Sequence, residues 1–376
     1  MSRLRSTLTA AVLFFGVTTH AEEAKPRLRS DPPVIVSSWD DLLDGVKTTD
    51  DWTKHRAVLR QRYLALIRDD RKPARVPLDL KVHEEIEIEG KYRRLYLSYQ
   101  VEAGERAHAY LGIPLNVKGK APAVVALHGT TAEGTKQTVG LSGNPDKAFL
   151  DQLCRHGYVV IAPEHFVSGE RIPKKGAYDT TAFYEKHPEW TAVGKFNFEH
   201  SIAVDVLLSR SEVDPANIAV MGHSLGGHGA YFLAAYDERL KACVCNCGGS
   251  FLRHNTSVEN FARNRWYVYL KPIRPLLLKG LLPDIDIHEI IALIAPRAFM
   301  DISALNDGDG LTQRQRALML LKIADVYALV GKPENFSFYI HGRGHSVPHE
   351  SRELICAFLD VHLKPAESTS THLLPR

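Results

Sequence analysis

Apolar and polar residues change their spacing along the chain, and this change separates regions of different structure. Residues 39–67 carry apolar residues at helical spacing, which predicts one or two helices packed on the outside of the main domain. Three segments at 82–88, 94–101 and 107–113 instead alternate apolar and polar positions. This period of two predicts antiparallel strands at one edge of a sheet.

The rest of the chain alternates short apolar runs with segments that can form helices. The runs predicted as strands are 123–127, 158–161, 218–221, 242–247, 298–302 and 336–340. The predicted helices lie within 145–156, 200–209, 227–236, 313–330 and 351–363. Repeated strand–helix alternation produces a mostly parallel sheet with helices on both faces. We therefore expect an α/β fold with a central sheet of about eight strands.

Two long segments interrupt this alternation. Residues 164–198 are polar and aromatic, and residues 248–287 hold Trp266, Tyr267 and Tyr269 together with several basic residues. Both segments begin at the carboxyl ends of predicted strands, where open α/β sheets bind their ligands. We expect them to form walls of a substrate pocket.

The first 21 residues have the three-part layout of a secretory signal. A short basic segment at 2–5 precedes an apolar run at 8–17, and small residues end the segment at Thr19 and Ala21. The apolar run is too short to span a bilayer. We expect an exported, secreted or periplasmic protein whose mature form has no membrane span.

These patterns suggest four parts, which are a signal peptide at 1–21, an N-terminal helical extension at 22–70, an α/β domain at 71–365 and a flexible tail at 366–376. A hydrophobic content of 44% and a charged content of 24% are ordinary for a soluble globular protein. The net charge is only +3, without a run of like charges, which argues against nucleic acid as a partner. Cys243, Cys245 and Cys247 alternate along one strand and are expected to be small buried residues. Neither a metal nor a cofactor is expected.

The segment at 218–230 carries the clearest chemical signal. An apolar run is followed by Gly222, His223, Ser224, Leu225 and Gly226, and then by a run of small and apolar residues. This is G-x-S-x-G between a strand and a helix, the arrangement of a nucleophile elbow. Glycine at the flanking positions lets strand and helix approach closely around a strained serine. Ser224 is the candidate nucleophile.

A serine nucleophile needs a base, and the base needs an orienting acid, which follow it in the order Ser, Asp or Glu, His. The loop around Asn306 offers Asp307, with Asp309 as the alternative, and Asp301 lies earlier, within a predicted strand. His345 lies among glycines that let its loop reach over the sheet. His341 is too close to the strand, and His349 is expected within the last helix.

The oxyanion hole should combine two backbone N–H groups. One belongs to Leu225, the residue after the nucleophile, and the other comes from the loop that follows Leu127. That loop begins His128-Gly129, so Thr130 or Thr131 would supply the second donor.

Several motifs together resemble the α/β-hydrolase superfamily, in particular its dienelactone hydrolase, acetyl xylan esterase and prolyl-oligopeptidase-like branch. They are L-H-G-T-T, G-Y-V-V-I-A-P, V-D-P-A-N-I-A-V-M-G-H-S-L-G-G, A-L-I-A-P-R and G-R-G-H-S, within about residues 111–363. The resemblance implies an α/β-hydrolase fold and an acyl-enzyme mechanism with Ser224, Asp307 and His345 as the triad. The region before the sheet is too short for an N-terminal propeller, which argues against a true oligopeptidase.

We therefore expect an exported serine hydrolase that cleaves carboxylic esters, including acylated or glucuronoyl carbohydrate esters. A peptidase or amidase with the same triad is the first alternative, since amides pass through the same tetrahedral intermediate. A non-catalytic binding protein that retains the fold is the second. Trp190 and Lys195 are candidate substrate-binding residues, because an indole stacks on sugar rings and an ammonium pairs with carboxylates.

Overall fold

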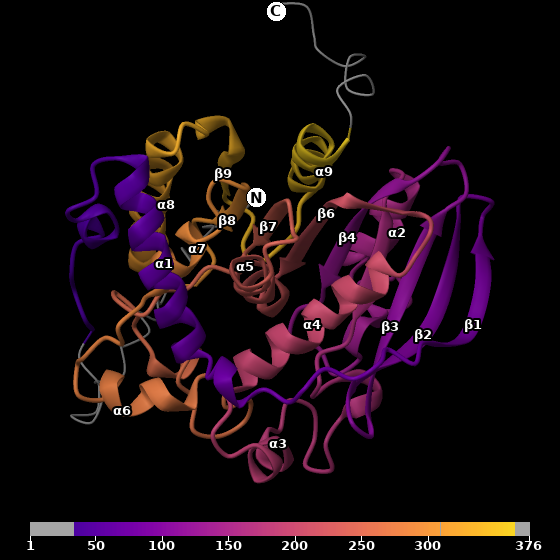
Figure 1. Ribbon diagram of the computed structural model, residues 1–376, viewed down its shortest axis with the longest axis horizontal. Helices are drawn as coiled ribbons and strands as arrows, with labels where there is room; N and C mark the ends of the chain where they lie inside the picture. The colour runs from indigo at the N-terminus through magenta and orange to yellow at the C-terminus, as the bar shows by residue number, and fades with distance from the viewer. Residues whose placement is uncertain (1–33, 309, 365–376) are drawn as a thin grey trace, which may run out of the picture. The chain divides into compact units, whose positions relative to one another are not determined.

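A nine-stranded sheet lies at the centre of the chain in the computed structural model, which describes residues 34–308 and 310–364 (Figure 1). From edge to edge the strands run β1-β2-β3-β5-β4-β6-β7-β8-β9. They are β1 (Lys81–Ile88), β2 (Tyr92–Glu102), β3 (Glu105–Pro114), β4 (Ala121–Leu127), β5 (Val159–Pro163), β6 (Val213–His223), β7 (Ala242–Asn246), β8 (Ala298–Ala304) and β9 (Phe336–His341). Each predicted strand is found, and the sheet has nine strands rather than about eight.

The sheet consists of an antiparallel edge and a parallel body. Strands β1, β2, β3 and β5 pair antiparallel in that order, whereas β5, β4, β6, β7, β8 and β9 form five parallel pairs. The parallel strands therefore all end along one border of the sheet, called here its carboxyl edge, which is distinct from the edge strands β1 and β9. This border is where α/β proteins place their functional loops. The loops that follow β4, β6, β7, β8 and β9 all leave from this edge.

Helices cover both faces of the sheet, because neighbouring residues of the parallel strands point to opposite faces and most of them are apolar. Val125 packs in a core cluster with residues of α1, α4, α5, α7 and α8, whereas Val124 packs with α2 and α9 on the other face. The helices are α1 (Thr49–Leu66), α2 (Phe149–Arg155), α3 (Thr181–Lys186), α4 (Ala192–Leu208), α5 (Leu225–Tyr236), α6 (Arg274–Leu277), α7 (Ile287–Ala292), α8 (Gly310–Leu329) and α9 (His349–Leu363). No helix in the described part of the chain has both the length and the apolar character needed to cross a membrane.

Helix α1 belongs to the predicted N-terminal extension and packs beside the helix that follows the elbow. Thr48 and Asp51 form a capping box at its start, which satisfies backbone N–H groups that the helix leaves free. Tyr63 is fully buried and donates a hydrogen bond to the Phe232 carbonyl oxygen of α5 at 2.7 Å. Arg60 donates to the Ala235 carbonyl oxygen near the end of the same helix. The extension thus supports α5 from outside.

Helix α4 begins eight residues earlier than predicted, at Ala192 instead of residue 200. The Thr191 side chain caps it by accepting a hydrogen bond from the Gly194 N–H at 2.9 Å. The polar residues in its first turns hid this start, because Lys195, Glu199 and their neighbours are buried here and break the expected apolar spacing. The end of the polar segment at 164–198 is therefore helical.

The two long segments, 164–198 and 248–287, lie against each other as well as against the sheet. The Tyr267 N–H donates to the Tyr178 carbonyl oxygen at 2.7 Å, and the Tyr184 hydroxyl donates to the Val268 carbonyl oxygen at 3.0 Å. These contacts join residues that are more than eighty positions apart in the chain, and both segments follow strands at the carboxyl edge of the sheet.

Candidate active site

Ser224 lies in the sharp turn between β6 and α5. Its φ of 59° and ψ of −121° are unfavourable for a residue with a side chain, which costs about 1–3 kcal/mol. The Ser224 N–H donates to the Asn246 carbonyl oxygen of β7 at 2.9 Å, and the Ser224 carbonyl oxygen accepts from the His228 N–H at 3.0 Å. The turn is therefore held from both sides, so that the strained serine keeps its position.

The flanking glycines are required by close backbone approach. A Cβ on Gly222 would lie 2.2 Å from the Gly226 carbonyl oxygen, and a Cβ on Gly226 would lie 2.1 Å from the Leu127 carbonyl oxygen. Neither contact can be relieved by turning a side chain, because both neighbours are backbone atoms. The glycines thus allow the elbow and the end of β4 to pack together, as the sequence pattern predicted.

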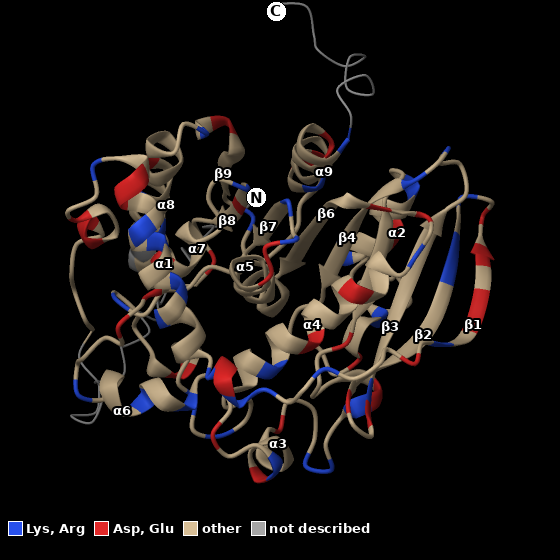
Figure 2. Cartoon of the chain, viewed as in Figure 1, with Lys and Arg blue, Asp and Glu red and all other residues tan. Residues whose placement is uncertain are grey.

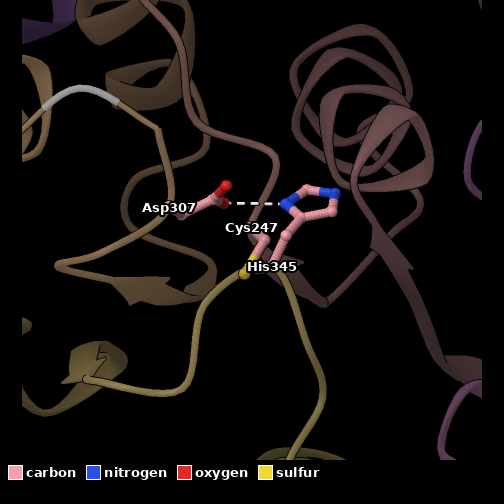
Figure 3. Close-up of side chains that lie close together, drawn as sticks. All are labelled: Cys247, Asp307 and His345. Atoms are coloured by element: carbon pink, nitrogen blue, oxygen red, sulfur yellow. Dashed lines mark hydrogen bonds and ion pairs between the residues drawn. The ribbon is translucent and has the colours of Figure 1, made fainter. Parts of the chain in front are cut away.

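His345 and Asp307 meet at the same edge of the sheet. The Nδ1 atom of His345 lies 2.7 Å from an Asp307 carboxylate oxygen, and both side chains are partly exposed (Figure 3). Burial alone would raise the pKa of Asp307, but the hydrogen bond and charge of His345 outweigh it and lower this pKa. The ionised carboxylate can therefore orient the imidazole and stabilise an imidazolium.

The loops that carry these two residues are joined by further hydrogen bonds. The Gly344 N–H donates to the Asn306 side-chain oxygen at 2.7 Å, and the Leu305 N–H donates to the His341 carbonyl oxygen at 2.8 Å. Gln313 donates from its side chain to the Asp307 carbonyl oxygen at 2.6 Å. The pairing of Asp307 with His345 is therefore one contact in a continuous network.

The other candidate acids and bases have different positions. Asp301 is fully buried on β8 and is ion-paired with Arg316, the partner that a buried carboxylate requires. Asp309 lies outside the described residues. His341 is buried and accepts a hydrogen bond from the Arg343 N–H, whereas His349 begins α9.

His223 lies between the elbow and the His345 loop. Its Nδ1–H donates to the Asn246 side-chain oxygen at 2.6 Å, and its ring centroid lies 4.6 Å from that of His345. Burial lowers the pKa of His223 to about 3, with a further contribution from the nearby Lys147 ammonium, so its ring stays neutral. In the described residues no hydrogen bond joins Ser224 to His345, a bond that often tightens only when substrate binds.

Cys247 is a neighbour of the pair that the sequence did not associate with the site. Its Sγ atom and the nearest ligand atoms of Asp307 and His345 lie within 4.8 Å of one another, which within the described chain is the spacing that a shared metal ion would need. Burial raises the pKa of the Cys247 thiol to about 12, so it is protonated and a poor ligand and nucleophile. Figure 3 shows the second ring nitrogen of His345 pointing away from this sulfur.

The loop after β4 lies against the elbow. A Cβ built on Gly129 would be 3.5 Å from the Ser224 Cβ. His128 supports the loop because its Nε2 accepts from the His165 N–H at 3.1 Å, which leaves its Nδ1–H to donate to the Gly129 carbonyl oxygen at 2.7 Å. Burial lowers the pKa of His128 to about 4, which keeps this arrangement neutral.

Tyr178 supports the same loop from the opposite wall. Its hydroxyl accepts from the Thr131 N–H at 2.8 Å and lies 2.9 Å from the Thr131 carbonyl oxygen. The Thr131 N–H is thus occupied, while Thr130 is exposed at the tip of the loop. Of the two predicted donors, Thr130 is the one that this hydrogen bond leaves available.

The structure does not bring Trp190 or Lys195 to this site. Trp190 is 2% exposed and packs edge-on against Phe198. The Lys195 ammonium lies 2.9 Å from both Glu105 and Glu199, within a buried ion-pair network. Both residues flank the early start of α4, which turns them into the core. Tyr178 is the aromatic residue of this segment that reaches the site, and no local pattern distinguished it from its aromatic neighbours.

Residues 107–264 match the Dienelactone hydrolase family. A protein of Bacillus subtilis (strain 168) named "Putative hydrolase YtaP" is 29% identical over 304 residues, which cover 77% of this chain and 94% of that protein. The solved structure "Glucuronoyl Esterase from Solibacter usitatus" aligns with a TM-score of 0.65 at 19% identity, covering 88% of this chain and 97% of its own. A "putative acetyl xylan esterase" from Bacteroides fragilis NCTC 9343 aligns with a TM-score of 0.61 at 18% identity, covering 83% of this chain and 79% of its own.

These similarities confirm the α/β-hydrolase fold and the resemblance to the dienelactone hydrolase branch that the sequence motifs predicted. The similarity to the two solved structures concerns the fold. The antiparallel edge, the parallel body and the elbow after β6 agree with this architecture.

Proposed function

We propose that this protein is a serine hydrolase that cleaves carboxylic esters of carbohydrates through an acyl-enzyme. The observation that carries the proposal is the strained Ser224 in the turn between β6 and α5, whose neighbour His223 packs against the ring of the Asp307-bound His345. Such a turn exposes the serine oxygen, and a base oriented by a carboxylate can accept its proton.

In the first half of the reaction, the Ser224 Oγ attacks the ester carbonyl carbon while its proton moves to Nε2 of His345. Asp307 keeps the proton on Nδ1 and stabilises the imidazolium. The negative charge on the carbonyl oxygen is stabilised by the N–H groups of Leu225 and Thr130. The tetrahedral intermediate then collapses, the alcohol leaves with the proton from His345, and Ser224 carries the acyl group.

In the second half, a water molecule gives a proton to His345 and attacks the acyl carbon. The second tetrahedral intermediate uses the same two backbone donors. Its collapse returns the proton to the Ser224 oxygen and releases the carboxylic acid, which ionises at neutral pH. Leu225 lies at the first position of α5, so the positive end of the helix dipole also favours the oxyanion.

The substrate class rests on the similar proteins. One of the aligned structures carries the name of a glucuronoyl esterase and another that of an acetyl xylan esterase. The triad alone would act on esters and amides, because both form the same tetrahedral intermediate. The names therefore favour carbohydrate esters over peptides.

A panel of substrates tests this proposal. The full-length protein and its Ser224→Ala variant should be assayed on short-chain aryl esters, acetylated xylan, a glucuronoyl ester and peptidyl anilides. We expect the wild type to cleave esters at least a hundredfold faster than anilides. Faster cleavage of the anilides would identify a peptidase. If the protein neither turns over any substrate nor is labelled by a serine-directed phosphonate, it is a binding protein.

We further propose that residues 1–21 direct export and are then removed. The basic, apolar and small-residue parts of this segment support the proposal, and the segment lies outside the described residues. N-terminal sequencing of protein recovered outside the cytoplasm should find Glu22 first. An intact Met1 in that fraction would contradict cleavage.

A further inference from the structure

An exposed tryptophan surrounded by basic side chains lies on one of the two walls of the site. Trp266 is 51% exposed, although burial of an indole is strongly favourable. Arg263, Arg265, Lys271 and Arg274 lie close to it in the chain, and blue bands mark basic residues on and beside α6 (Figure 2). We refer to these five residues as the basic aromatic face.

The backbone holds Trp266 in this position at a cost. Trp266 and Tyr267 have φ of 48° and 51°, a left-handed conformation that costs about 1–2 kcal/mol for each residue with a side chain. The Trp266 indole N–H donates to the Ala177 carbonyl oxygen at 3.1 Å, and the Arg263 guanidinium lies 5.1 Å from the indole ring. Two strained residues and two contacts thus fix an aromatic ring that is half exposed.

The positive charge of the face is largely uncompensated. In the part of the chain that the structure describes, no ion pair involves Arg263, Arg265 or Lys271, whereas Arg274 pairs with Glu259 at 2.8 Å. A cavity of about 540 Å³ is lined by Glu259, Arg263, Asn264, Arg265, Trp266 and Arg274. One carboxylate thus faces three guanidinium groups around a hollow large enough for a sugar unit.

The face borders the loop that reaches the candidate nucleophile. The ring of Trp266 lies 5.9 Å from that of Tyr178. The Tyr178 hydroxyl lies 3.3 Å from the Gly129 carbonyl oxygen, and Gly129 packs against Ser224. Tyr178, which is buried, therefore links Trp266 to the loop after β4 and through it to the elbow.

We infer that the basic aromatic face binds an acidic polysaccharide, with the indole under a sugar ring and the guanidinium groups on uronate carboxylates. Arginine pairs with carboxylates in a bidentate manner, and aromatic rings stack on the apolar face of pyranoses. This inference rests on the proposed function for the position of the ester, and it adds the charge class of the substrate. The single exposed indole favours isolated sugar rings over a row of stacked nucleobases.

Binding is tested with the full-length Ser224→Ala variant, which removes turnover from the measurement. Affinity electrophoresis and calorimetry should compare polygalacturonate and glucuronoxylan with neutral arabinoxylan, single-stranded DNA and vesicles of phosphatidylglycerol. We expect binding to the uronate polymers that weakens with salt and is at least about tenfold tighter than binding to the others.

Variants of the face give the matched comparison. Trp266→Gly removes the ring and suits the left-handed backbone, and Arg263→Gln with Arg265→Gln removes two charges. Each should weaken uronate binding by roughly tenfold or more. Lys118→Gln with Lys120→Gln removes two exposed charges just before β4, at the amino ends of the parallel strands. This control should change binding less than twofold.

Three results would overturn the inference: no uronate binding, equal binding to DNA or vesicles, or equal loss in the lysine control. Circular dichroism of each variant identifies a loss caused by unfolding, and the arginine variant then decides the question. Uronate binding without ester turnover by the wild type would reject the proposed function alone. Turnover of small esters without uronate binding would reject this inference alone.

Discussion

The Nδ1 atom of His345 lies 2.7 Å from the carboxylate of Asp307, and each residue comes from a loop at the end of a different strand. The two strands, β8 and β9, are parallel neighbours, so their carboxyl ends deliver both loops to one place. The Asn306 side chain then joins the acid loop to the Gly344 N–H. The pair is therefore held by the sheet and by its own loops.

Replacement of Asp307 by Asn keeps the shape of the side chain and removes its charge. We expect Asp307→Asn to lower ester turnover by about a thousandfold or more, because the imidazolium loses its stabilising carboxylate. Asp309→Asn should cost less than about tenfold. Both variants should be compared in one ester assay after their folding is checked. If Asp309→Asn is the more damaged variant, the acid is two residues further along the loop.

Ser224→Ala should leave a folded protein whose turnover falls by several powers of ten, since only binding and the oxyanion donors remain. A serine-directed phosphonate should label the wild type once, on the peptide that contains Ser224. Cys247→Ala is the matched control, because this thiol lies beside the same histidine and aspartate but is protonated. Its turnover should stay within about fivefold of wild type. The reverse ranking of the two variants would make Cys247 the nucleophile.

Tyr178→Phe removes the hydroxyl that accepts a hydrogen bond from the Thr131 N–H, in the loop after β4 that carries the expected oxyanion donor Thr130. We expect kcat to fall by roughly ten- to a hundredfold with little change in KM. A displaced Thr130 N–H would stabilise the transition state less well but would leave substrate binding almost unchanged. Tyr184→Phe is the control, since its hydroxyl joins the same two walls through Val268 without reaching the loop. Equal effects of the two variants on kcat would mean that Tyr178 only packs the walls.

The free energy of unfolding should depend on pH through Glu164, which follows β5. Burial raises its pKa to about 7, and its carboxyl group accepts from the Glu170 N–H at 3.0 Å. The neutral acid is favoured in the folded protein, so folding is weakened as pH rises from about 4.5 through about 7.

Glu164→Gln should remove this loss. The free energy of unfolding, measured with urea at pH 5 and pH 8, should fall by on the order of 2 kcal/mol more in wild type than in the variant. A difference that is the same at both pH values would mean that Glu164 is ionised throughout.

The strands and the elbow followed from the sequence because their signals are local. Alternating and continuous apolar runs identified each strand, and these spacings depend only on neighbouring residues and on which faces are covered. The glycines around Ser224 likewise report a local requirement, since any Cβ there would meet backbone. Asp307 and His345 were predicted from the order Ser, Asp or Glu, His in which the partners follow a nucleophile elbow.

The positions of polar side chains in the two long segments depended on the tertiary structure. Lys195 looked available for a substrate carboxylate, but the early start of α4 buries it among Glu102, Glu105 and Glu199. Glu199 lies one turn further along α4, whereas Glu102 and Glu105 belong to β2 and β3 and meet Lys195 only after the sheet forms. A buried ion pair leaves no mark in the spacing of apolar residues, because each member looks like a surface residue.

The partners of Tyr178 and Asp307 also depended on the tertiary structure. Nothing near Tyr178 in the chain distinguishes it from Tyr184, yet the packing of residues 164–198 against 248–287 turns its hydroxyl to the loop after β4. Asp301 and Asp307 were both acids near the end of one strand. The sequence placed Asp301 within a strand and Asp307 in the loop after it, and the fold supplied the partner of each, which is Arg316 for the first and His345 for the second. Local backbone preferences depend on neighbouring residues and can be predicted from the sequence. The partner of a charged or hydroxyl group depends instead on contacts between segments that are distant in the chain.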